Sequence, residues 1–173
     1  NQDNRHEIIS FDGSFHGRTF GAISTSNAQK MIGGFGPLLP GCKSIDLKDE
    51  GLIIDAITAK TAAVIIEPIQ GEGGIKVVSD DKLQLLRKIC DELGVLLIFD
   101  EVQCGMGRTG RLFAHEWTGI YPDIMTTAKG IGGGFPLGAC LASHKAAKGM
   151  EIGSHGSTYG GNPLACAVGC EVF

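Results

Sequence analysis

The sequence has no excess of positive charge and no uninterrupted apolar segment of membrane-spanning length. Its 15 Lys and Arg residues are outnumbered by 19 Asp and Glu residues, which gives a net charge of -4. This balance disfavours nucleic acid and anionic membranes as partners, because both select a basic face. The uncharged segment 152–170 contains His155, Asn162 and Pro163, which argue against a transmembrane helix. We therefore expect a cytoplasmic protein whose ligands are small polar metabolites.

The sequence also lacks the cysteine spacing of a redox or zinc site. None of its six cysteines forms a Cys-x-x-Cys pair, and most of them lie in apolar segments. Buried, reduced thiols are therefore expected. Cys166 and Cys170 are one helical turn apart, but no histidine completes a zinc site, so we predict no bound metal.

The most informative segment of the sequence is Val95–Gln103. It is an apolar stretch closed by an acidic pair, which predicts a strand buried on both faces and ending at Asp100. A carboxylate at that point is costly unless a cation or hydrogen-bond donors meet it. Asp100 is therefore expected to have a fixed positive partner, such as the protonated ring nitrogen of a cofactor.

Three kinds of site fit such a strand. A Walker B carboxylate would require Gly-x-x-x-x-Gly-Lys-[Ser/Thr], which is absent. The segment 105–110 matches Gly-x-Gly-x-x-Gly, but it does not follow the strand directly and opens no long helix, as a dinucleotide-binding loop would. In a pyridoxal phosphate site, Asp100 would pair with the ring nitrogen and Lys129 would bind the cofactor covalently. A lysine whose stem packs on the surface remains the alternative for Lys129.

The chain around this strand has the pattern of an α/β sheet. Residues 62–67 form a second apolar strand, and between the two strands Ser79 is expected to cap a helix that ends at Gly94. Strand, helix and strand in this order predict a right-handed βαβ unit with parallel strands. The same edge of the sheet should then carry Glu67, Glu72 and Asp100, and ligands bind at such edges.

The remaining elements are predicted from apolar periodicity and turn residues. They are strands at 8–11, 123–127 and 138–143, a helix at 49–60, a long surface loop at 27–41, and a helix that begins after the cap Asn162.

Taken together, these segments strongly resemble the class III pyridoxal phosphate aminotransferases. The matching blocks are Phe15-His-Gly-Arg-Thr, Glu67-Pro-Ile-Gln-Gly-Glu-Gly-Gly, Leu97-Ile-Phe-Asp-Glu-Val-Gln, Gly107-Arg-Thr-Gly, Ala128-Lys-Gly-Ile-Gly-Gly-Gly-Phe-Pro and His155-Gly-Ser-Thr-Tyr-Gly-Gly-Asn-Pro. Their order and spacing are those of the family. The resemblance implies the large domain of fold type I, a mostly parallel mixed sheet flanked by helices.

The resemblance assigns Lys129 and Asp100 as the catalytic residues. Lys129 would hold pyridoxal 5'-phosphate and shuttle the proton, while Asp100 keeps the ring nitrogen protonated. Val102 would pack under the ring and Phe15 over it, and Gln103 would reach the ring hydroxyl.

Further assignments follow from the same motifs. His16 and Glu101 are expected beside the cofactor as neighbours of Phe15 and Asp100, and Thr158 resembles the residue that reaches the cofactor phosphate of a neighbouring subunit. A homodimer is therefore expected. The implied substrate contacts are Arg18, which would clamp a carboxylate, Ser157 and Glu72.

The residues around the lysine favour N-acetylornithine as amino donor and 2-oxoglutarate as acceptor, a reaction of arginine biosynthesis. Ornithine, succinyl-diaminopimelate and 4-aminobutyrate remain alternatives, as does a non-catalytic fragment. In the family, a phosphate-binding loop precedes the first strand and a small domain follows the last helix. Residues 1–173 are therefore expected to be the central part of the cofactor-binding domain.

Overall fold

The computed structural model describes residues 4–27 and 29–173, which form an α/β fold around one mixed sheet. Its strands, in spatial order, are β2 (Cys42–Ile45), β1 (Glu7–Phe11), β3 (Thr61–Ile66), β6 (Leu96–Asp100), β7 (Ile124–Thr127) and β8 (Ala139–Ala142). All neighbouring pairs are parallel except β7 and β8. The predicted fold class, a mostly parallel mixed sheet, is confirmed.

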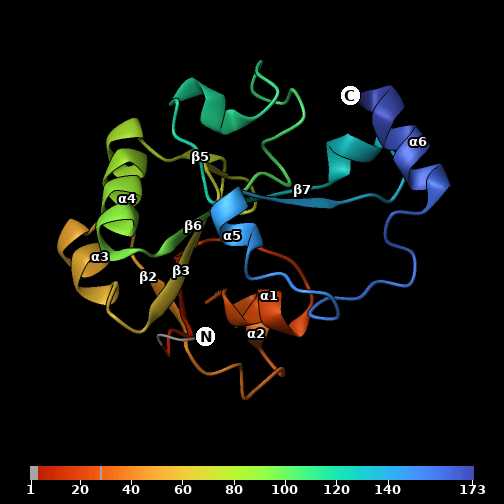
Figure 1. The fold of residues 1–173 in the computed structure, drawn as a ribbon. Coiled ribbons are helices and arrows are strands. Elements are labelled where there is room, and N and C mark those ends of the chain that lie inside the picture. The colour runs from red at the N-terminus through yellow and green to blue at the C-terminus, as the bar shows by residue number, and fades with distance from the viewer. Residues whose placement is uncertain (1–3, 28) are drawn as a thin grey trace.

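Helices flank this sheet. The α-helices are α1 (Phe20–Ser24), α2 (Gln29–Ile32), α3 (Glu50–Ala56), α4 (Asp80–Leu93), α5 (His144–Ala147) and α6 (Pro163–Val172); the 3-10 helices are η1 (Ala114–Trp117) and η2 (Lys129–Gly132). Figure 1 shows α3 and α4 together on one side of the sheet and α6 well away from them. A short antiparallel hairpin, β4 (Ile69–Gln70) with β5 (Lys76–Val77), stands at the exit of β3.

The core lies between the central strands and the two helices α3 and α4. Phe11, Val64 and Phe99 from the strands have no exposed surface, and Ile53 and Leu86 of the helices pack against this cluster. Burying each such side chain contributes about 2 kcal/mol. The apolar runs of the central strands are explained by this arrangement, since helices cover a parallel sheet.

Helix α4 is the best-predicted helix because both its periodicity and its stop residue are clear. Leu83, Leu86 and Cys90 face the core, whereas Leu93 is 44% exposed. Gly94 ends the helix in the left-handed conformation with φ 64°, and its N–H donates to the carbonyls of residues 90 and 91. Ser79 precedes the helix as predicted, but its side chain makes no capping hydrogen bond.

Short elements differ from the sequence prediction. The helix expected at 49–60 ends at Ala56, where a turn built by Thr58 and Thr61 takes over, and its Leu52 is 48% exposed. The expected loop at 27–41 contains α2, and residues 71–75 form the turn of a hairpin that is not predicted from the sequence. Each of these elements is too short for its period to be recognised.

The cysteines are free in the part of the chain that the structure describes, but they are not uniformly buried. Cys90 and Cys104 are buried, whereas Cys140, Cys166 and Cys170 are exposed. The expectation of buried thiols was therefore wrong for the last three, because β8 and α6 leave much of their surface uncovered. None of the described helices has the length and hydropathy needed to cross a bilayer.

Substituting Gly94 by Ala should destabilise the protein by about 1 kcal/mol, because a side chain at positive φ is strained. No heavy atom lies within 4 Å of the added Cβ, so the backbone conformation alone causes the loss. The matched control is Gly21→Ala in α1, where φ is not positive and the space is equally open. That variant should gain about 0.5 to 1 kcal/mol. Urea unfolding would measure both, and equal effects of the two substitutions would contradict the assignment.

Candidate active site

The carboxylate of Asp100 is buried at the end of β6 and is held by three donors. Its Oδ1 accepts from the backbone N–H of Val102 at 3.1 Å and from the hydroxyl of Thr126 at 3.2 Å. Its Oδ2 lies 2.8 Å from Nδ1 of His16. The residue is only 5% exposed. The predicted need for donors at this carboxylate is met by three separate segments of the chain.

His16 lies in the loop after β1 and is as well enclosed as its partner. Its side chain is 3% exposed, and its Nε2 has no hydrogen-bond partner among the residues that the structure describes. A buried ring nitrogen without a partner is costly unless a water molecule or ligand supplies one. His16 therefore fixes the orientation of Asp100 through one nitrogen, while the other is left without a partner among the described residues.

Glu67 places a second buried carboxylate beside Asp100. Its Oε1 accepts from the N–H of Phe15 at 2.8 Å and its Oε2 from the N–H of Gly71 at 3.3 Å. Burial raises the pKa of Glu67, and the nearby Asp100 raises it further, although the two N–H donors and His16 oppose this shift. Glu67 was placed at this edge by the sequence but was not assigned to the site. Its position at the end of a buried strand is the same signal that identified Asp100.

Lys129 follows β7 and opens η2 with a φ of 50°, a conformation that is strained for any residue with a side chain. The next residue is packed tightly, since a Cβ on Gly130 would lie 2.9 Å from Cβ of Met106. Lys129 itself is exposed. Its backbone is fixed while its amine is open to solvent.

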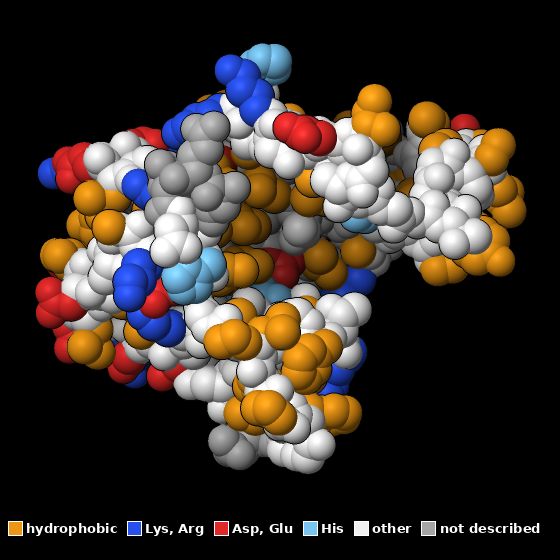
Figure 2. Space-filling view, turned by 60° about the horizontal axis from the view of Figure 1, so that its bottom comes forward, with side chains coloured by type: hydrophobic (Ala, Val, Ile, Leu, Met, Phe, Trp, Pro, Cys, Tyr) orange, Lys and Arg blue, Asp and Glu red, His pale blue; other side chains and the backbone are white. Residues whose placement is uncertain are grey.

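These side chains surround one small cavity of about 60 Å³. Its lining residues are Phe15, His16, Gly17, Glu67, Asp100, Val102, Gln103 and Lys129. A larger cavity of about 610 Å³ adjoins it and shares Val102, Gln103 and Lys129. Figure 2 shows a hollow in which acidic and histidine side chains lie deep among hydrophobic ones. The structure thus brings together six of the residues that the sequence assigned to the cofactor: 15, 16, 100, 102, 103 and 129.

Arg18 lies close to this cavity without lining it. Its guanidinium carbon is 5.4 Å from the centre of the Phe15 ring, within the range of a cation–π contact. The residue is exposed and therefore accessible to a carboxylate from solvent.

Glu101 does not face the cavity, which corrects its assignment as a cofactor contact. Successive residues of a strand point to opposite faces, so Asp100 and Glu101 diverge. Glu101 is fully buried, and its carboxylate accepts from the backbone N–H groups of Ala114 and His115.

Glu72, Ser157 and Thr158 are exposed and line neither of these cavities. Glu72 lies in the turn of the β4–β5 hairpin, and the other two lie in the segment before α6. The structure of this chain does not bring them to Asp100, and their assignments remain predictions.

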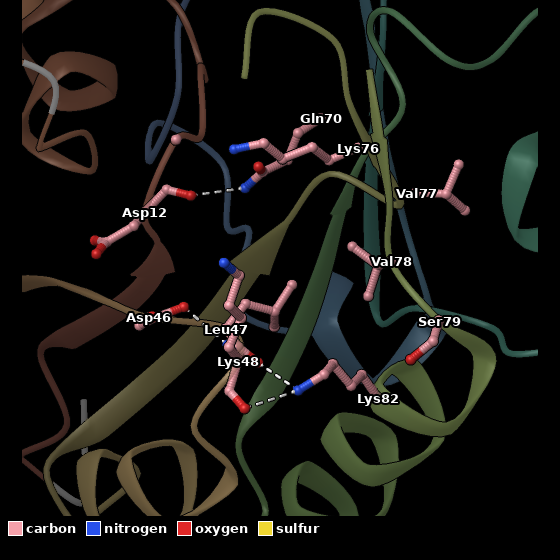
Figure 3. A pocket seen from close by; sticks show the side chains of 11 residues that line it. Asp12, Asp46, Leu47, Lys48, Gln70, Lys76, Val77, Val78, Ser79 and Lys82 are labelled. Atoms are coloured by element: carbon pink, nitrogen blue, oxygen red, sulfur yellow. Dashed lines mark hydrogen bonds between the residues drawn. The ribbon is translucent and has the colours of Figure 1, made fainter. Parts of the chain in front are cut away.

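A separate cavity of about 510 Å³ lies beneath the hairpin and beside the start of α4. Figure 3 shows Lys82 directed to the backbone oxygens of Leu47 and Lys48, at 2.6 and 3.3 Å. Gln70 lines this cavity and is tied to the loop after β1, since its amide donates to the carbonyl of Asp12 at 3.1 Å. Gln70, which lines this third cavity, therefore holds the loop that carries Phe15.

Comparison with known proteins now identifies the family. Residues 1–173 match the family model described as "Aminotransferase class-III". The chain belongs to the class-III aminotransferase family. Among curated members of this family, acetylornithine aminotransferase of Rhodobacter capsulatus is 58% identical over 172 residues, and that of Clostridium acetobutylicum is 54% identical over 171 residues.

Solved aminotransferases share the fold. The ornithine aminotransferase of Toxoplasma gondii ME49 superposes with a TM-score of 0.93 at 38% identity, covering 99% of this chain and 41% of that one. The N-acetylornithine aminotransferase of Stenotrophomonas maltophilia K279a gives 0.74 at 41% identity, covering 99% and 38%. The two curated relatives are each covered to 44%, against 99% of this chain. The chain thus spans less than half the length of the class-III aminotransferases that it matches.

The raised pKa of Glu67 predicts a specific pH dependence of stability. A carboxyl whose pKa is higher in the folded state favours folding below the pKa of the unfolded chain, and this contribution is lost as the pH rises through the folded pKa. The wild type should therefore lose stability relative to Glu67→Gln as the pH increases from 4.5. Urea midpoints of both proteins over a pH series would measure this difference, and a difference that stays constant or grows in favour of the wild type would contradict the shift.

Proposed function

We propose that this chain is the central part of the cofactor-binding domain of a pyridoxal phosphate-dependent transaminase, which transfers the terminal amino group of N-acetylornithine to 2-oxoglutarate. The observation that carries this proposal is that Asp100 and Lys129 line one cavity together with Phe15 and Val102. The names of the curated relatives support the choice of amino donor.

The chemistry of the cavity fits the cofactor. An aromatic ring and a branched aliphatic side chain, Phe15 and Val102, supply apolar groups that suit a flat heteroaromatic ring, and the Gln103 amide suits a ring hydroxyl. The buried Asp100 would hold the ring nitrogen and Lys129 would hold the aldehyde carbon. When bound, pyridoxal phosphate supplies an electron sink for the electron pair that a substrate carbon keeps after losing its proton.

This chemistry depends on the carboxylate of Asp100, which the protein holds in a fixed orientation. Because three donors hold Asp100, its carboxylate is oriented before any ligand arrives, and no reorganisation is needed when a cation meets it. Once its amine is no longer bonded to the aldehyde carbon of the cofactor, Lys129 could accept and return a proton at Nζ. This would make it the general base of the site. His16 keeps the acid in place through Nδ1 and is a positioning residue.

Substrate contacts are proposed from the same motifs. Arg18 is exposed beside Phe15 and can bind a carboxylate by a bidentate pair. Glu72 and Ser157 are proposed as further substrate contacts, and Thr158 as a contact to the cofactor phosphate of a second subunit in a cytoplasmic homodimer. The similarity to ornithine aminotransferase makes ornithine the second candidate donor.

Treating the full-length protein with pyridoxal phosphate and then with borohydride should label Lys129, because its amine is accessible at the edge of the cavity. Peptide mapping identifies the labelled residue. Lys129→Ala should lose the label, whereas Lys145→Ala, at another lysine in α5, should keep it. A wild-type protein labelled elsewhere or not at all would support a non-catalytic protein instead.

Asp100→Asn should lower kcat for transamination of N-acetylornithine by about 100-fold, because a neutral amide no longer stabilises a protonated ring nitrogen. Rates of the half-reaction with the amino donor would be followed by the absorbance of the cofactor. Asp123→Asn, which alters a carboxylate bound to Arg87 at the other end of β7, is the control and should retain kcat within a few-fold.

The same assay with the wild type decides the donor. N-acetylornithine should react faster than ornithine, and the reverse order would make ornithine the proposed amino donor.

A kcat that is unchanged in Asp100→Asn would show that the carboxylate of Asp100 is not needed for the reaction.

A further inference from the structure

The structure contains a buried acid next to Asp100 that the proposed chemistry does not use. Glu101 has no exposed surface, although a buried carboxylate is costly unless it is fully hydrogen-bonded. Its Oε2 accepts from the N–H of Ala114 at 2.5 Å, and its Oε1 accepts from the N–H of His115 at 2.9 Å. Nδ1 of the His115 ring lies 2.8 Å from the same Oε1. One side chain thus ties the end of β6 to η1, a segment more than ten residues further along the chain.

His115 is in turn held by aromatic neighbours. Its ring stacks on Phe113 with centres 5.8 Å apart and an interplanar angle of 15°, and it meets Tyr121 edge-on at 5.7 Å. Phe99, on β6, lies 6.3 Å away. The residue is 7% exposed. Packing therefore fixes both the accepting carboxylate of Glu101 and the donor groups of His115.

The backbone of Glu101 closes the turn that carries two cavity residues. Its N–H donates to the carbonyl of Thr126 at 2.9 Å, and its carbonyl accepts from the N–H of Gly105 at 3.0 Å. The turn is compact, because a Cβ on Gly105 would lie 2.7 Å from the carbonyl oxygen of Glu101. Val102 and Gln103 lie between these anchors, so their placement depends on residue 101.

Contacts from this segment extend to both sides of the cavity. The side chain of Gln103 lies against Gly71, where an added Cβ would come within 1.2 Å of its oxygen. Met106, at φ 53°, packs against Gly130 beside Lys129. A shift of this turn would therefore move Gln103 and the support of Lys129 together.

We propose that Glu101 and His115 form a positioning pair, whose buried hydrogen bonds hold residues 102–106 so that Val102 and Gln103 face the cofactor. The inference rests on the proposed function, because it assigns these two residues a task in cofactor binding. Neither residue touches the cavity that contains Asp100. Their effect is transmitted through the turn.

The test uses Glu101→Gln in the full-length enzyme. The amide keeps the shape of the side chain but turns one acceptor into a donor that faces an N–H or a ring nitrogen. The dissociation constant for pyridoxal phosphate should rise about tenfold, and the absorption band of the bound cofactor should shift because Gln103 moves relative to the ring. Spectroscopic titration measures both quantities.

Two further variants separate positioning from general stability. Leu86→Ala removes a fully buried core side chain of α4 that lines neither cavity of the site, and it should lower Tm without altering cofactor affinity or the absorption band. His115→Gln keeps both backbone donors to Glu101 and should weaken cofactor binding less than Glu101→Gln does. If Glu101→Gln does not fold, His115→Gln decides: a shifted absorption band supports the pair, and an unchanged band overturns it.

A Glu101→Gln enzyme with a lower Tm but cofactor affinity within twofold of the wild type and an unchanged band would overturn the inference, since the pair would then only stabilise the fold. That result leaves the proposed function intact. A wild type that does not bind pyridoxal phosphate would instead overturn the proposed function and this inference with it.

Discussion

The buried carboxylate of Asp100 is the constraint on which the rest of the site depends. An acid that is 5% exposed must be met by donors, and here they come from the loop after β1, from the turn after β6 and from β7. Satisfying one side chain therefore fixes three strand ends relative to each other. Neighbouring parallel strands bring these ends to one edge of the sheet, which is why residues separated by more than eighty positions meet there.

Two other buried carboxylates also hold separate segments together through hydrogen bonds. They belong to Glu67 at the end of β3 and to Glu101 next to Asp100. Each of these carboxylates accepts from backbone N–H groups of a loop and so fixes that loop to the sheet. Glu67 holds the loop that carries Phe15, while the carboxylate of Glu101 holds η1 to the end of β6. The loop that carries Phe15, an apolar residue lining the cavity, is therefore positioned by a buried acid rather than by flexible surface side chains.

The sequence was sufficient where a pattern is long or where burial conflicts with charge. Helix α4 and the central strands were predicted within a residue or two, and Asp100 was found because a charge at the end of an apolar strand requires an explanation. Helices α1, α2 and α5 and the β4–β5 hairpin were missed, since a few residues do not define a period. Glu101 was assigned to the wrong side because motif membership was given more weight than strand alternation. The exposure of Lys129 and the partner of Asp100 depend on contacts between distant segments, which one sequence does not contain.

The charges around the cavity also define which part of a ligand it can bind. Two carboxylates, Asp100 and Glu67, face one amine, Lys129, and among the described residues that line the cavity no other side chain carries a permanent positive charge. Such a cavity suits a cationic ring and an aldehyde carbon, but it is unfavourable for a dianionic phosphate. Within the proposed function, the phosphate must therefore be bound outside this cavity, by neutral donors and cations on other segments. Within the same proposal, the sheet edge would bind the ring, and its buried acids would not face the phosphate.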